Sequence, residues 1–270
     1  MLPTTFSFIK TATKPSIALE YSGSGEAVIM LHGIGGNRTN WWDQIEFLKK
    51  QFLAIAWDAR GYGDSDDYNG NLIFEDFSED LASVLSQFGL ESAHVVGLSM
   101  GGRIAMQFAA KYPHKVSSLT LVDTHLGFQN MAEETRNAFI ESRREPLLAG
   151  KETKDIAPPV AASLCSKNAI PSAMEKFIES MANLHKESYI KAIESSVNND
   201  RFDDYGLIKA PTIVIVGEDD QLTPISMAEE IQQKISDAKL AVIPNAGHLS
   251  NFEQPDVFNN ILADFYKNLS

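Results

Sequence analysis

The stretch Gly97-Leu98-Ser99-Met100-Gly101-Gly102 indicates the fold more strongly than any other part of the sequence. The apolar run 93–98 leads into it, and residues 101–111, which follow, have the apolar spacing of a helix. The pattern therefore predicts a serine at a sharp turn between a β-strand and an α-helix. Glycines two positions before and after the serine suit such a turn, because they have no Cβ atom to collide with neighbouring backbone.

Strands and helices alternate on both sides of this stretch. Continuous apolar runs of the kind that form buried parallel strands occur at 27–31 and 52–57, and further strands are expected at 93–98, 116–122, 212–216 and 240–243. Helical spacing occurs at 41–51, 77–88, 101–111, 225–235 and 257–266. Two short strands at 5–10 and 16–21 precede them, on either side of a turn, and read as an antiparallel opening. The sequence thus predicts an α/β fold with a mostly parallel central sheet flanked by helices.

The alternation is interrupted after the sixth expected strand. Residues 124–205 contain helical stretches and no convincing strand pattern. A helical insertion at this point lies over the edge where open α/β sheets bind ligands. We therefore predict a core formed by residues 1–123 and 206–270, and a helical lid formed by residues 124–205.

Composition narrows the classes of partner. The chain has 270 residues, with 23 basic and 36 acidic side chains and a formal charge of −13. This charge disfavours binding to nucleic acid and to anionic membranes. No apolar run approaches the roughly 20 residues of a membrane-spanning helix, and no export signal is visible. The single cysteine, Cys165, fits a reducing compartment, so we expect a cytoplasmic protein.

A serine becomes a good nucleophile only when a base removes its proton. For Ser99, the best candidate base is His248, because the loop after the apolar run 240–243 presents it at the carboxyl end of a strand. His32 also ends a strand and remains a rival on position alone. His125 falls at the start of the expected lid, where it is a candidate pocket residue.

A third group should hold the base in the right tautomer. The segment 217–224 follows an apolar strand and contains Glu218, Asp219 and Asp220. We favour Asp220 as the acid, and Asp219 remains an alternative. Asp123, at the end of the run 116–122, is a further alternative from a neighbouring strand.

Negative charge that develops on a carbonyl oxygen requires donors already aimed at it. The glycine-rich turn His32-Gly33-Ile34-Gly35-Gly36 follows the strand 27–31, and Met100 follows the serine. We expect the backbone amides of Ile34 and Met100 to form this oxyanion hole. No metal and no organic cofactor is implied, and no set of substrate-binding residues is predicted.

With these motifs in place, nearly the whole chain resembles the lidded serine hydrolases of the α/β-hydrolase family. The matching stretches are 32–36, 58–65, 97–102, 217–224 and 245–248. The resemblance implies the order nucleophile, acid, histidine along the chain, here Ser99, Asp220 and His248. It also favours Asp220 through the position of Pro224, because the family's acid commonly lies four residues before that proline.

The resemblance extends to carboxylesterases, 3-oxoadipate enol-lactonases and carbon–carbon bond hydrolases of aromatic breakdown. It implies hydrolysis of a small carboxylic ester through an acyl-enzyme intermediate. Two alternatives stay open: hydrolysis of an enol-lactone or a vinylogous diketone, and a non-hydrolytic receptor for a small ligand. The expected partner is a small-molecule ester or lactone.

Overall fold

The computed structural model describes residues 6–198 and 202–269. Within these residues eight strands form one sheet in the order β1-β2-β4-β3-β5-β6-β7-β8. Their bounds are β1 Ser7–Lys10, β2 Ala18–Ser22, β3 Ala27–Leu31, β4 Leu53–Trp57, β5 Ala93–Leu98, β6 Val116–Val122, β7 Thr212–Gly217 and β8 Lys239–Ile243. The six strands β3 to β8 are parallel to one another, so their carboxyl ends meet at one edge of the sheet.

The first two strands of the chain form the expected antiparallel part of the sheet, at one of its edges. β1 pairs with β2, and β2 pairs with β4, both in antiparallel register. The second strand begins at Ala18 rather than at residue 16, because the amide of Ile17 binds the hydroxyl of Thr11. Thr5, where the first strand was expected to begin, lies outside the described residues.

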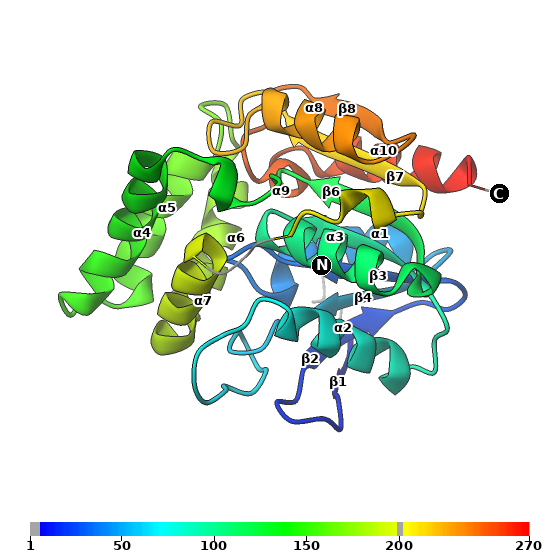
Figure 1. Ribbon diagram of the computed structural model, residues 1–270, viewed down its shortest axis with the longest axis horizontal. Coiled ribbons are helices and arrows are strands. Elements are labelled where there is room, and N and C mark those ends of the chain that lie inside the picture. Colours follow the sequence, from blue (N-terminus) through cyan, green and yellow to red (C-terminus); the bar gives the residue numbers. More distant parts are fainter. Residues whose placement is uncertain (1–5, 199–201, 270) are drawn as a thin grey trace.

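Helices flank the sheet on both faces (Figure 1). They are α1 Trp42–Leu48, α2 Asp76–Gln87, α3 Met100–Lys111, α8 Ile225–Lys234 and α10 Pro255–Lys267, with the short α9 at Ser250–Glu253. The first of these helices is shorter than the expected 41–51. A 3₁₀ turn, Arg38–Trp41, precedes it, and the side chains of Asn37 and Asn40 cap that turn reciprocally.

Three strands of the central sheet are buried along their whole length. Every residue of β3, β5 and β7 is buried, as expected for strands covered on both faces. This is why their sequences are mostly apolar and do not alternate between apolar and polar residues. None of the helices in residues 6–198 and 202–269 has the length and apolar character needed to cross a bilayer.

Four helices separate β6 from β7: α4 Glu133–Leu148, α5 Thr153–Leu164, α6 Pro171–Ala182 and α7 Lys186–Asn198. They stand together at one end of the sheet in Figure 1. Between residues 124 and 205 the described part of the chain contains no strand, but residues 199–201 lie outside it. The division into a core and a lid at residues 124–205 stays a prediction.

Candidate active site

Ser99 occupies the turn between β5 and α3 in a strained conformation. Its φ is 52° and its ψ is −113°, values that residues with a side chain rarely adopt. A Cβ atom on Gly97 would overlap the backbone of Gly101, and one on Gly101 would overlap the carbonyl oxygen of Leu31. The two glycines therefore allow the turn to pack tightly enough to expose the serine hydroxyl at its tip.

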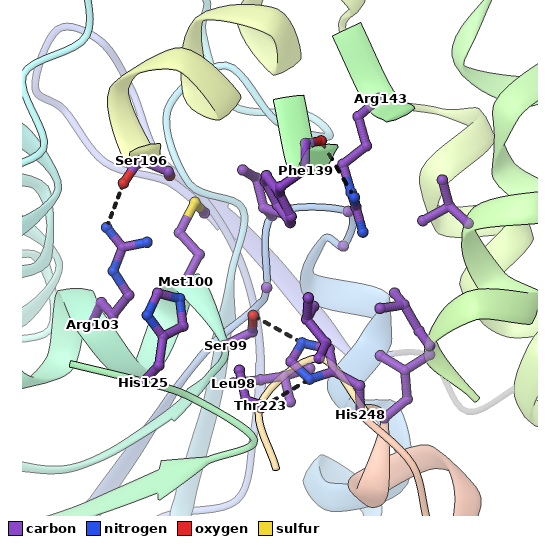
Figure 2. Close-up of a pocket in the computed structure, with 18 of the residues that line it drawn as sticks. Leu98, Ser99, Met100, Arg103, His125, Phe139, Arg143, Ser196, Thr223 and His248 are labelled. Carbon is purple, nitrogen blue, oxygen red and sulfur yellow. Dashed lines mark hydrogen bonds between the residues drawn. The ribbon is translucent and has the colours of Figure 1, made fainter. Parts of the chain in front are cut away.

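A continuous chain of hydrogen bonds joins Ser99 to His248 and Asp220. The distance from Ser99 Oγ to His248 Nε2 is 3.0 Å, and Figure 2 shows this bond at the floor of a pocket. On the other side of the ring, His248 Nδ1 lies 2.9 Å from Asp220 Oδ2. When Nδ1–H donates to the carboxylate, Nε2 is left as the acceptor for the serine proton.

The carboxylate of Asp220 is held by its own loop. Its Oδ1 accepts hydrogen bonds from the amides of Leu222 and Thr223, each at 2.9 Å. The Thr223 hydroxyl donates to Oδ2 at 2.6 Å. Burial works against ionisation, but the charge and hydrogen bond of His248, together with Thr223, lower the pKa of Asp220 below its usual range.

The same pairing acts in the opposite direction on the imidazole. Burial of His248 disfavours its charged form, yet the negative charge and hydrogen bond of Asp220 outweigh burial and raise the pKa of His248 above 6.5. A raised pKa makes the ring a stronger proton acceptor in the presence of Asp220.

The two other candidate acids do not contact the imidazole. Asp219 is half-buried, and its backbone amide binds the carbonyl of Ala246. Asp123 is fully buried, but its carboxylate accepts hydrogen bonds from the amide of Gly217 at 2.8 Å and from the amide and hydroxyl of Ser250 at 3.0 and 2.6 Å. Asp123 thus ties the end of β6 to the loops that contain Asp220 and His248. Burial and the charge of Asp220 raise the pKa of Asp123.

His32, the rival base, lies among structural contacts. Its Nδ1 lies 2.8 Å from the carbonyl oxygen of Gly33, and its Nε2 accepts a hydrogen bond from the amide of Ala59 at 3.0 Å. The ring is fully buried, so neither nitrogen is free to accept a proton from Ser99. These two bonds fix the glycine-rich turn against the end of β4.

This arrangement predicts a pH dependence of stability. Burial lowers the pKa of His32 to about 4, with the Gly33 hydrogen bond opposing that shift. The unfolded chain binds more protons between pH 6.5 and pH 4, so stability is complete above this window and falls as the pH drops through it. Wild-type protein should lose about 3 kcal/mol of unfolding free energy between pH 7 and pH 4 through this residue.

Urea unfolding at both pH values measures this loss. His32→Asn should lack that component of the pH dependence, although it is less stable at pH 7. His114→Asn, which changes an exposed histidine, is the matched control and should behave as wild type. Equal pH dependence in wild type and His32→Asn would contradict the assignment.

A pocket of about 40 Å³ lies above Ser99 and His248. Its wall is mainly apolar, and the helices α4 to α7 contribute Phe139, Val160, Phe177 and Tyr189. A larger groove of about 930 Å³ shares several of these walls and opens between α4 and α5. His125, the candidate pocket residue, lines the inner pocket (Figure 2).

Sequence reasoning missed the basic residues of this pocket. Arg103 of α3 and Arg143 of α4 both line it, and both are buried. Arg103 donates to the carbonyl oxygen of Ser196 at 2.9 Å. Their sequence context gives little signal, because arginines on amphipathic helices are normally exposed.

The two expected oxyanion donors border the same pocket as Ser99. Ile34 lies in the turn after β3, and Met100 is the first residue of α3, whose amide has no acceptor within the helix. In residues 6–198 and 202–269, neither amide donates a hydrogen bond to a protein oxygen. Both amides are therefore available to a ligand, and their role in the reaction stays a prediction.

Comparison with known proteins identifies the family of this chain. A family model described as the alpha/beta hydrolase fold matches residues 26–255. The chain belongs to the α/β-hydrolase fold family. The expected fold, a mostly parallel sheet flanked by helices, is confirmed for this α/β-hydrolase.

Individual relatives span almost the full length of this α/β-hydrolase. A 2-hydroxy-6-oxononadienedioate/2-hydroxy-6-oxononatrienedioate hydrolase from Comamonas testosteroni is 32% identical over 93% of this chain and 91% of its own length. The 3-oxoadipate enol-lactonase 1 from Acinetobacter baylyi is 28% identical over 94% of this chain and 93% of its own. A thermophilic esterase from Thermogutta terrifontis superposes with a TM-score of 0.86 at 28% identity, covering 97% of this chain and 99% of that one.

Proposed function

We propose that this α/β-hydrolase cleaves small carboxylic esters through an acyl-enzyme intermediate, with Ser99 as nucleophile, His248 as base and Asp220 as the acid that orients the base. The observation that carries the proposal is the unbroken hydrogen-bond chain from Ser99 Oγ through the imidazole to Asp220, with lengths of 3.0 and 2.9 Å. Each group in this chain lies after the end of a different strand, and the order serine, acid, histidine along the chain is that of α/β-hydrolases.

The chemistry follows from the position of each proton. Ser99 Oγ attacks the ester carbonyl carbon while His248 Nε2 accepts the hydroxyl proton. The imidazolium then gives this proton to the departing alcohol, so the carbon–oxygen bond breaks and the acyl group stays on Ser99. Water repeats the sequence, with His248 as base, and releases the carboxylic acid. Asp220 stays ionised throughout and stabilises the imidazolium.

The amides of Ile34 and Met100 are proposed to bind the oxyanion of the tetrahedral intermediates. Both border the pocket beside Ser99, and neither is engaged by another oxygen in the described part of the chain. Met100 also begins α3, and the amino end of a helix favours negative charge.

Residues 124–205 are proposed to act as the lid of this site. Side chains from α4 to α7 line the pocket, and the backbone amide of His248 donates to the carbonyl oxygen of Leu164 in α5 at 2.8 Å. This bond ties the histidine loop to the lid helices. The inner pocket of about 40 Å³ fits a small acyl group better than a long chain.

Hydrolysis of an enol-lactone is the second candidate. It uses the same attack on an acyl carbonyl, and one relative is named as a 3-oxoadipate enol-lactonase. A non-hydrolytic receptor on this fold has less support, because the Ser99 hydroxyl is hydrogen-bonded to a base that is itself paired with a carboxylate.

Labelling with a fluorophosphonate, followed by peptide mapping, tests the proposal. We expect a single phosphonylated site at Ser99, together with hydrolysis of short-chain aryl esters such as p-nitrophenyl acetate. The same preparation is assayed on an enol-lactone. A strong preference for the lactone would favour the second candidate. Tight ligand binding without labelling or turnover would favour the receptor and contradict the hydrolase.

A further inference from the structure

Arg143 is a buried cation in the wall of the pocket. Only 7% of the residue is exposed. Its Nη1 donates to the Ser142 hydroxyl at 3.0 Å and lies 3.4 Å from the carbonyl oxygen of Phe139, and its guanidinium stacks 4.0 Å from the centre of the Phe139 ring. These contacts are to neutral groups of its own helix, α4, and the guanidinium also faces the hydroxyl of Tyr189 on α7, a neutral group that favours the charged form of Arg143.

No carboxylate balances this charge within the described residues. Ion pairs with acidic side chains engage Arg38, Arg60 and Arg144, but in residues 6–198 and 202–269 no carboxylate oxygen lies within 4.0 Å of a nitrogen of Arg143. Burying a cation without a counter-ion is costly. The burial lowers the pKa of Arg143 from its usual value, which expresses the same cost. The described part of the protein therefore leaves the charge of this buried guanidinium available to an anionic ligand.

The guanidinium is placed where a substrate would meet it. Arg143 lines both the inner pocket and the outer groove, so it lies where the two spaces adjoin. Figure 2 shows its side chain extending from α4 into the pocket on the side of Ser99 and His248. Its charge also acts to lower the pKa of His248, against the larger effect of Asp220, which agrees with that placement.

Further hydrogen-bond donors border the same space. Tyr189 of α7 lines the pocket beside Arg143, and burial raises the pKa of its hydroxyl to about 12, so it remains a neutral donor. Asn40 Nδ2 and Ser196 Oγ, on two other pocket residues, are buried without a hydrogen-bond partner among the described residues. A cation with unpaired donors nearby suits a ligand that brings acceptor oxygens.

We propose that Arg143 binds a free carboxylate of the substrate, so that the enzyme prefers esters or lactones that carry one carboxylate in addition to the bond being cleaved. The inference rests on the proposed hydrolase function and narrows its substrate class. A guanidinium matches a carboxylate through two parallel N–H···O bonds, which gives orientation as well as attraction. The proposal is limited to one carboxylate because the formal charge of −13 works against more highly charged substrates.

The test compares charged esters with neutral isosteres. The monomethyl esters of succinate, glutarate and adipate are each paired with the corresponding methyl ester in which an amide replaces the free carboxylate. Acetoxyacetate and acetoxyacetamide form a pair with the charge on the alcohol side. Hydrolysis is followed by NMR. In wild type, at least one charged ester should exceed its isostere by about tenfold or more in kcat/KM.

Arg143→Gln should reduce kcat/KM for the preferred charged ester by about tenfold or more, down to the level of its neutral isostere, because it removes one partner of a desolvated charge pair. The informative quantity is the ratio of kcat/KM for the charged ester to that for its neutral isostere, which should fall toward one in this variant. Arg144→Gln is the matched control. Arg144 is the next residue, lies partly exposed, and pairs with Glu145 and Glu194, so its replacement should leave both substrates unaffected. Arg143→Lys keeps the positive charge but loses the planar guanidinium that binds a carboxylate through two hydrogen bonds. Its kcat/KM for the charged ester should therefore lie between those of wild type and Arg143→Gln.

Protection of Ser99 from fluorophosphonate gives a second readout that does not need turnover. The charged ester should slow labelling of wild type more than its isostere does, and Arg143→Gln should abolish that difference. Equal hydrolysis and equal protection by the charged and neutral compounds in wild type would overturn the carboxylate inference while leaving the hydrolase intact. Absence of both labelling and hydrolysis would instead refute the proposed function, and this inference with it.

Discussion

Replacing Ser99 by alanine should reduce kcat for ester hydrolysis by about six orders of magnitude, since it removes the atom that forms the acyl-enzyme. The small remaining activity would come from direct attack of water on the bound ester, assisted by the oxyanion donors and by binding in the pocket. Steady-state assays with p-nitrophenyl acetate at high enzyme concentration measure this loss. Ser99→Ala should also show no fluorophosphonate labelling.

The variant is expected to fold. Alanine removes only the hydroxyl, whose hydrogen bond goes to the side chain of His248. The strained backbone at φ 52° is imposed by the packing of β5 against α3 and does not depend on that hydroxyl. Ser92→Ala, which changes a partly exposed serine before β5, is the matched control and should keep full activity. Activity of Ser99→Ala within tenfold of wild type would refute Ser99 as the nucleophile.

Asp220→Asn should lower kcat by about four orders of magnitude with little effect on folding. The amide has the size of the carboxylate but lacks its charge. Its NH₂ group would donate to Nδ1 and hold the proton on Nε2, where it blocks acceptance of the serine proton. The imidazolium formed in the reaction would also lose its counter-charge. Steady-state kinetics with the same ester, together with thermal unfolding, separate catalysis from stability.

Asp219→Asn provides the matched comparison, since Asp219 is the adjacent residue and its carboxylate does not contact His248 in the structure. We expect its kcat to stay within about threefold of wild type. The buried Asp123 offers a second comparison, because its carboxylate binds Gly217 and Ser250. If Asp219→Asn or Asp123→Asn lost more activity than Asp220→Asn, the assignment of the acid would have to move.

Most of the fold was accessible from local sequence patterns. The apolar run at 27–31 coincides with β3, and the expected strands 93–98 and 116–122 coincide with β5 and β6, because strands covered on both faces are rich in apolar residues. Helix ends were less accurate. The expected helix 41–51 contains α1 only at Trp42–Leu48, and the main difference is at its carboxyl end, where the amides of Gln51 and Phe52 both bind the carbonyl of Leu48 in a turn. Helix ends of this kind are weak signals in a single sequence.

The sequence by itself determined the serine turn and the strand ends that carry the polar residues, because turn chemistry and burial act on neighbouring residues. It left Asp123, Asp219 and Asp220 as candidates, all three of which follow strands. Only the tertiary structure placed Asp220 Oδ2 at 2.9 Å from His248 while directing Asp123 to Ser250.

The position of Arg143 was even less accessible from the sequence than the choice of the acid. Its sequence neighbours give no reason to place a buried cation in a pocket, and that position results from the packing of α4 against α5 and α7, beside pocket residues that lie far away in the chain. Hydrogen bonds and charge burial are sensitive to differences of a few tenths of an ångström in the distances between such segments. Those distances are set by how helices and strand ends pack together, which no local pattern records.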